Sequence, residues 1–169
     1  MAFNFFLALI PVFLGAAVFK KEFTFIKFLG AIVWFFFLPN SIYLITDIVN
    51  LVGDIRYISG IYLLADAILF LVLIPVGIVT YVLSVLPFTK RFTHFHLFIL
   101  NIFVGFGLIL GRVQRVNSWE VVTNPQNVVL KSIEMLTSIE LILLIAIMAG
   151  LCQVIYILFK DKVIKLVRT

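Results

Sequence analysis

The sequence predicts an all-α protein, an integral membrane helical bundle that forms a single domain over residues 1–169. Composition is the first observation, because 64% of the residues are hydrophobic and only 12% are charged. Soluble domains are roughly half apolar and a quarter charged, and the mean hydropathy here is +1.25. The second observation is that the apolar residues form runs close to the roughly 20 residues that span a bilayer. We expect about five spans, near 2–19, 25–46, 61–86, 95–111 and 138–159.

The first run, 2–19, has the hydrophobicity of a signal peptide but not its charge pattern. Lys20 and Lys21 follow the apolar residues, whereas a signal peptide carries its positive charges first. No small-x-small cleavage site is followed by a soluble domain. We therefore expect a helix that stays in the membrane.

The second run contains Pro39, which interrupts the backbone hydrogen bonds of a helix and suits the first turn of a new one. We expect this helix to break there. Beyond Pro39, polar residues follow at steps of three and four, so they share one helix face. They are Asn40, Tyr43, Asp47, Asn50 and Asp54. Such a stripe should face a cavity, the membrane surface or other polar groups instead of lipid tails.

The last three runs each carry one informative feature. The third holds Asp66 near its beginning, where a charge costs less than the roughly 2.5–3.5 kcal/mol expected at a helix centre. The fourth contains Gly107 and Gly111, whose spacing lets helices approach closely. The fifth follows Thr137-Ser-Ile-Glu140, a capping-box pattern that marks a helix start.

The distribution of Lys and Arg predicts the orientation, because cytoplasmic loops are enriched in these residues. Five alternating spans put nine of the 13 basic residues on one side: Lys20, Lys21, Lys27, Lys90, Arg91, Lys160, Lys162, Lys165 and Arg168. We expect that side to be cytoplasmic, with the N-terminus outside and the C-terminus inside. The predicted location is the cytoplasmic membrane, with a multi-pass topology.

The same topology gathers the polar residues that are the candidate binding site at the outer surface. They are Asn40, Tyr43, Asp47, Asp66, Arg112, Arg115, Asn117, Trp119 and Glu120. Asp47 and Asp66 are the candidate catalytic bases, and the arginines are suited to phosphate or carboxylate. Structural alternatives stay open for each: Arg112 and Arg115 as snorkelling anchors, Trp119 as an interfacial belt residue, and either Asp as an ion-pair partner.

Other chemistries find little support in the sequence. There is no Gly-rich phosphate loop, nucleophile elbow or HExxH motif, and no cofactor is expected. Cys152 stands alone, and His94 and His96 lie far from the carboxylates, so we expect no metal site. The basic residues sit at segment ends and form no stripe that would follow a nucleic acid.

Three stretches resemble an uncharacterised family of bacterial multi-pass membrane proteins, catalogued as domain of unknown function 1361. They are FNFFLALIP (3–11), WFFFLPNSIYLITDIVNL (34–51) and GRVQRVNSWEVVTNP (111–125). The resemblance implies the hallmark motifs PNxxYxxTD and GRxxRxNSW. Here these correspond to Pro39, Asn40, Tyr43, Thr46, Asp47, Gly111, Arg112, Arg115, Asn117, Ser118 and Trp119. The resemblance implies no particular reaction.

Three functions follow as hypotheses. The first is binding or transport of an anionic small molecule or lipid headgroup, with membrane lipids or a lipid-linked anion as partner and a homo-oligomer or partner subunit if it transports. The second is an enzyme acting on a lipid or lipid-linked substrate, with Asp47 or Asp66 as base. The third is a structural or accessory subunit in which the polar cluster only specifies packing.

Overall fold

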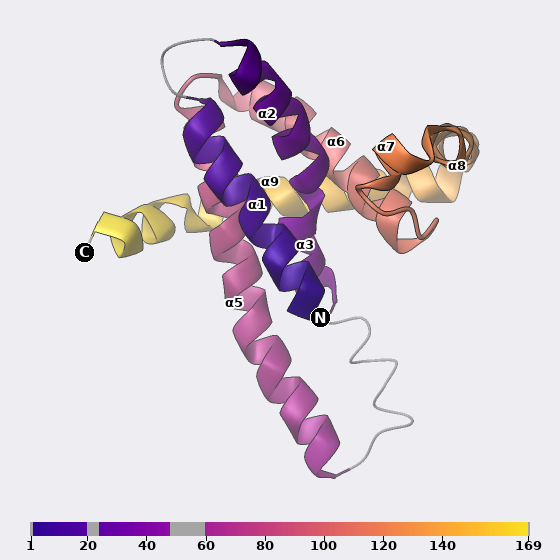
Figure 1. Ribbon diagram of the computed structural model, residues 1–169. Coiled ribbons are helices and arrows are strands. Elements are labelled where there is room, and N and C mark those ends of the chain that lie inside the picture. The colour runs from indigo at the N-terminus through magenta and orange to yellow at the C-terminus, as the bar shows by residue number, and fades with distance from the viewer. Residues whose placement is uncertain (1, 20–23, 48–59, 169) are drawn as a thin grey trace.

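The computed structural model describes residues 2–19, 24–47 and 60–168, and within these residues all regular secondary structure is helical. The prediction of an all-α protein is confirmed. Figure 1 shows the arrangement of the helices, and their bounds are as follows. They are α1 (Ala2–Val18), α2 (Phe25–Phe37), α3 (Pro39–Thr46), α5 (Ile61–Thr89), α6 (His94–Arg112), α7 (Glu120–Thr123), α8 (Pro125–Thr137) and α9 (Ile139–Arg168).

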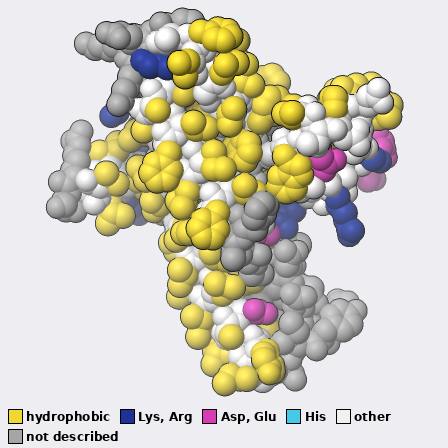
Figure 2. All heavy atoms as spheres, viewed as in Figure 1, with side chains coloured by type: hydrophobic (Ala, Val, Ile, Leu, Met, Phe, Trp, Pro, Cys, Tyr) yellow, Lys and Arg dark blue, Asp and Glu magenta, His cyan; other side chains and the backbone are white. Residues whose placement is uncertain are grey.

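Among the described residues, four helical stretches are long and apolar enough to cross a membrane: Phe25–Thr46, Ile61–Thr89, His94–Arg112 and Ile139–Val167. The first predicted span corresponds to α1, which is apolar but has only 17 residues. Large apolar side chains lie exposed on these helices, and Figure 2 shows them covering the visible surface of α5. Soluble monomers rarely expose so wide an apolar surface. These features indicate a membrane protein.

The predicted break at Pro39 is confirmed, and it is a single residue wide. Leu38, between α2 and α3, keeps helical torsion angles (φ −56°, ψ −39°). The chain is therefore interrupted at this point without unwinding. Asn40 Nδ2 donates a hydrogen bond to Phe37 O at 3.0 Å and so supplies a partner for a carbonyl beside the break.

The helix starts and ends between α6 and α9 differ from the prediction in one place. Asn124 caps α8, because its side chain accepts a hydrogen bond from Asn127 N at 3.4 Å. The cap of α9, however, is Ser138, whose hydroxyl accepts from Leu141 N at 3.5 Å. The predicted capping box from Thr137 to Glu140 is wrong by one residue, because Thr137 instead closes α8 and donates to Glu134 O.

The helices pack in two groups that share a core. α1 contacts α5, α2 and α3, while α6 contacts α9 most extensively, and α5 also contacts α9. The core between them contains Trp34, Leu38, Tyr81, Leu97 and Cys152, all buried. Aromatic rings close one end of the bundle, where Phe19, Trp34, Phe88 and Phe92 have neighbouring ring centroids 4.6–6.4 Å apart.

The close approach predicted from Gly107 and Gly111 is confirmed. A Cβ at Gly107 would lie 2.8 Å from Pro39 Cγ, and one at Gly111 would lie 1.4 Å from Tyr43 Oη. Neither contact is possible for real atoms. These two glycines therefore let α6 lie directly against α3, and this contact positions the site described below.

A second polar group lies inside the bundle, and we call Tyr81, Asn101 and Gln153 the central network. Tyr81 Oη donates to Asn101 Oδ1 at 2.5 Å, and Asn101 Nδ2 donates to Gln153 Oε1 at 2.7 Å. Tyr81 and Asn101 are both 0% exposed. The network joins α5, α6 and α9, and its hydrogen bonds offset the free-energy cost of burying these polar groups.

Candidate functional site

The C-terminal end of α3 is bound by an arginine from α6. Arg112 Nη2 forms an ion pair with Asp47 Oδ1 and donates to Tyr43 O and Thr46 Oγ1, each at 3.1 Å. Helix C-terminal carbonyls carry partial negative charge, and Asp47 adds a full one at the same place. The guanidinium therefore compensates both the carboxylate and the end of the helix.

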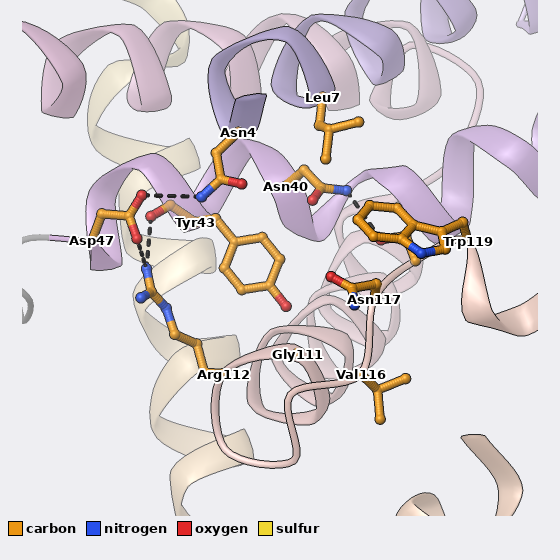
Figure 3. Close-up of a pocket in the computed structure, with 11 residues that line it drawn as sticks. Asn4, Leu7, Asn40, Tyr43, Asp47, Gly111, Arg112, Val116, Asn117 and Trp119 are labelled. Atoms are coloured by element: carbon orange, nitrogen blue, oxygen red, sulfur yellow. Dashed lines mark hydrogen bonds and ion pairs between the residues drawn. The ribbon is translucent and has the colours of Figure 1, made fainter. Parts of the chain in front are cut away.

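Asp47 is enclosed from a second side by α1. Asn4 Nδ2 donates to Asp47 Oδ2 at 3.3 Å, so each carboxylate oxygen accepts a hydrogen bond. The Asp47 side chain is only 4% exposed, compared with 25% for Arg112. Arg112 also lies over the Tyr43 ring, with its Cζ 5.4 Å from the ring centroid. Figure 3 shows these side chains converging from α1, α3 and α6.

The chain reverses direction immediately after α6. Arg115 adopts a left-handed conformation (φ 56°), and Val116 N donates to Leu110 O at 3.3 Å. This reversal folds residues 116–119 back beside the end of the helix. Arg115 itself is exposed, since the helix does not continue to carry it onto the face of Arg112.

Two side-chain contacts fix the returning segment. Asn40 Nδ2 donates to Ser118 Oγ at 3.2 Å, which ties the helix break in α2–α3 to this segment. Asn117 N and Nδ2 both donate to Glu120 Oε1, at 2.8 and 2.9 Å. Hydrogen bonds from the Asn117 backbone, then from its side chain and from Asn127, lower the pKa of Glu120. Glu120 therefore acts as the acceptor that organises the turn.

These elements enclose a cavity of about 240 Å³, which we call the polar cavity. Its lining comes from α1, α3, the end of α6 and the returning segment (Figure 3). The lining residues are Asn4, Leu7, Asn40, Tyr43, Asp47, Gly111, Arg112, Val116, Asn117, Ser118 and Trp119. Most of these side chains can donate or accept hydrogen bonds. The cavity is suited to a small polar group.

A second cavity of about 220 Å³ adjoins the first, and we call it the apolar groove. It runs between α2, α6 and α8, and most of its lining is aromatic or aliphatic. Tyr43, Val116, Asn117 and Ser118 line both cavities. The two cavities therefore meet along a shared wall.

Six of the nine predicted site residues line the polar cavity: Asn40, Tyr43, Asp47, Arg112, Asn117 and Trp119. The other three do not line this cavity, which corrects their predicted grouping with the first six. Arg115 is exposed to solvent, Glu120 accepts hydrogen bonds from Asn117, and Asp66 is half-buried on α5. Figure 1 shows why Asp66 is separate, because the first turns of α5 extend well past the ends of α1 and α3. Asn50 and Asp54 of the predicted stripe lie outside the described residues.

Three further lining residues, Asn4, Leu7 and Val116, were not predicted from the sequence. Asn4 is the one polar side chain of an otherwise apolar first helix, which is the signal that could have found it. Gly111 and Ser118 were part of the family motifs but were not placed in the site. Val116 gave no signal, because its position depends on the reversal at Arg115.

The contacts of Asp47 and Ser118 describe the chemistry available in the cavity. Both carboxylate oxygens of Asp47 already accept hydrogen bonds, one from Arg112 and one from Asn4. Ser118 has no histidine beside it in the lining. Among the described residues no group of three or more His, Cys, Asp or Glu could hold a metal ion.

Comparison with known proteins gives one clear result. A family model described as "Protein of unknown function (DUF1361)" matches residues 3–155. This match covers most of the chain, including the three stretches whose resemblance was noted in the sequence. Searches of curated proteins and of solved structures give no match. The chain thus belongs to the DUF1361 family.

Proposed function

We propose that the polar cavity binds an anionic group, a phosphate or carboxylate, carried by a small molecule or a lipid headgroup. One observation carries the proposal: Arg112 Nε is buried and has no hydrogen-bond partner among the described residues. A buried donor without an acceptor costs about 1–3 kcal/mol, and more when the group is charged. Arg112 lines the polar cavity, so a small shift of its side chain would bring Nε to a bound anion, which would supply the acceptor.

The use of the guanidinium supports this step. All the hydrogen bonds of Arg112 to described residues come from Nη2. The donors Nε and Nη1 are therefore not used for holding α3. Hydrogen bonds from a guanidinium to phosphate or carboxylate are charge-assisted and are stronger than those between neutral groups.

Ser118 offers a second donor to the same cavity. Its hydroxyl accepts from Asn40 Nδ2, and a hydroxyl that accepts still has its own O–H to donate. Ser118 lines the polar cavity together with Arg112. The charge of Asp47 is already compensated by Arg112 and Asn4, which reduces its repulsion of an incoming anion.

A structural role for the cluster is the second candidate, and one specific observation favours it. The Arg112–Asp47 ion pair bridges α3 and α6, and one partner is almost fully buried. Such pairs can serve to fix helix packing. The two candidates differ in the partner that they give to Nε. The binding role supplies an acceptor from a ligand in the cavity, whereas the structural role supplies none.

Native mass spectrometry of the purified protein in mild detergent tests the proposal. The probes are phosphatidylglycerol and phosphatidylcholine with identical chains, titrated against wild type, Arg112→Lys and Lys131→Gln. Arg112→Lys keeps a cation beside Asp47 but removes Nε. Lys131→Gln is the matched control, because Lys131 is an exposed cation on α8 that pairs with Glu134 at 2.8 Å, outside the cavity.

We expect wild type to prefer phosphatidylglycerol, Arg112→Lys to bind it at least tenfold more weakly, and Lys131→Gln to match wild type. A thermal unfolding curve for each variant verifies that it is folded. Equal binding of both lipids by all three proteins would reject the proposal and leave the structural role.

A further inference from the structure

Building on the proposed function, we infer that the ligand is an amphiphile and that its hydrocarbon chain lies in the apolar groove while its anionic group occupies the polar cavity. The inference deepens the proposed function by naming the ligand class. It rests on two neighbouring cavities of opposite character that share lining residues, both described above.

The shared lining residues show how one ligand could occupy both cavities. Tyr43, Asn117 and Ser118 line both of them, and Arg112 lines the polar cavity alone. A chain in the groove would lie on one side of these residues, and an anionic group near Arg112 would lie on the other. An amphiphile has this order of parts, with the charged group at one end and the chain at the other.

The groove has the chemistry of a chain site. Phe35 and Phe36 of α2 line one side, Phe103 and Phe106 of α6 the other, and Val128 of α8 lies across from them. Gly107 and Pro39 meet beneath it, so no side chain from Gly107 fills the space. Apolar walls with few polar groups are typical of sites that hold the apolar part of a ligand.

The groove is also open to the apolar exterior. Phe36 is 38% exposed and Phe103 is 52% exposed, and both belong to helices long and apolar enough to cross a membrane. A chain already dissolved in the bilayer could therefore enter from the side without crossing water.

Blocking the groove provides the test, and α8 offers a matched pair of neighbouring valines. Val128 lines the groove, whereas Val129 does not and is 57% exposed. Val128→Trp should fill the groove, and Val129→Trp adds the same bulk to the other face. The probes are lysophosphatidylglycerol, which has one chain, and glycerol phosphate, which has the anionic group alone.

We expect Val128→Trp to bind lysophosphatidylglycerol at least tenfold more weakly than wild type, measured by native mass spectrometry in the same detergent. Val129→Trp should bind it as wild type does. Glycerol phosphate should compete for the cavity equally well in all three proteins, because the anionic group needs no groove. Its failure to compete in wild type would show that the site does not hold the anionic group alone and would overturn the division of the ligand between the two cavities.

The outcomes separate this inference from the proposed function. If Val128→Trp binds the single-chain lipid as tightly as Val129→Trp, the chain does not lie in the groove and the inference is overturned. If the groove variant weakens binding while Arg112→Lys does not, the chain site stands and the anion site falls. If a folded Val128→Trp loses glycerol phosphate as well, the variant has disturbed the polar cavity, and the assignment of the groove to the chain fails.

Discussion

The polar cavity and the central network are both groups of polar side chains in an apolar bundle, but they differ in how completely they are satisfied. In the central network, Tyr81 donates to Asn101 and Asn101 donates to Gln153, with Tyr81 and Asn101 fully buried. In the polar cavity, Arg112 Nε has no partner among the described residues and its side chain is 25% exposed. The first arrangement joins three helices through satisfied hydrogen bonds, whereas the second leaves one donor for the ligand that we propose.

Removing Arg112 should have the largest effect on stability, because it strips a nearly buried carboxylate of its cation. Arg112→Ala leaves Asp47 and the end of α3 uncompensated, and breaking such a pair costs about 3–5 kcal/mol. The measurement is the free energy of unfolding in detergent. Lys131→Ala, which breaks an exposed pair, should cost less than about 1 kcal/mol. Equal losses in the free energy of unfolding would show that the Arg112–Asp47 pair stabilises the fold no more than an exposed ion pair does.

The contact of α6 with Tyr43 gives the next largest effect. A Cβ at Gly111 would lie 1.4 Å from Tyr43 Oη, so Gly111→Ala should cost about 2–3 kcal/mol through overpacking. The control is Gly150→Ala on α9, where a Cβ would meet nothing within 4 Å. That change should gain up to about 1 kcal/mol from helix propensity. Similar unfolding curves for the two variants would contradict the close packing of α3 and α6.

The central network should matter for stability and leave binding unchanged. Asn101→Leu removes the partner of both Tyr81 and Gln153 and should cost about 2 kcal/mol. The affinity for phosphatidylglycerol, measured on the folded variant, should stay within twofold of wild type. A variant of normal stability with lost binding would reverse the roles assigned to the two regions.

The smallest effect concerns the reversal at Arg115. A non-glycine residue in the left-handed conformation costs roughly 1–2 kcal/mol, and Arg115 lies outside the cavity. Arg115→Gly should therefore raise the free energy of unfolding by about 1 kcal/mol without weakening binding. Arg115→Val should lower it, because a β-branched residue tolerates this conformation poorly. Loss of binding in a stable Arg115→Gly protein would assign this arginine to the ligand.

The sequence predicts the polar cavity better than it predicts the central network, and the reason is periodicity. Asn40, Tyr43 and Asp47 repeat at helical spacing after Pro39, so their common face can be read directly. Tyr81, Asn101 and Gln153 come one each from three different helices. Their meeting depends on how α5, α6 and α9 rotate against one another, which no local pattern records.

The errors within the site have similar physical causes. Arg115 was placed beside Arg112 on the assumption of a continuing helix, and the end of α6 could not be located within an unbroken polar stretch. Asp66 was placed at the same level as Asp47, but α5 begins well beyond the other helix ends (Figure 1). Helix lengths and staggers are set by tertiary packing, and composition alone does not contain them.

The most direct test of the central claim observes the Arg112 side chain itself. NMR of protein labelled with ¹⁵N-arginine resolves the Nε–H groups, and Arg112→Lys identifies the signal of Arg112. We predict that lysophosphatidylglycerol shifts this signal and slows its hydrogen exchange, while the Arg115 signal stays unchanged. An unchanged Arg112 signal with the lipid bound would contradict the account, because the ligand would then lie elsewhere.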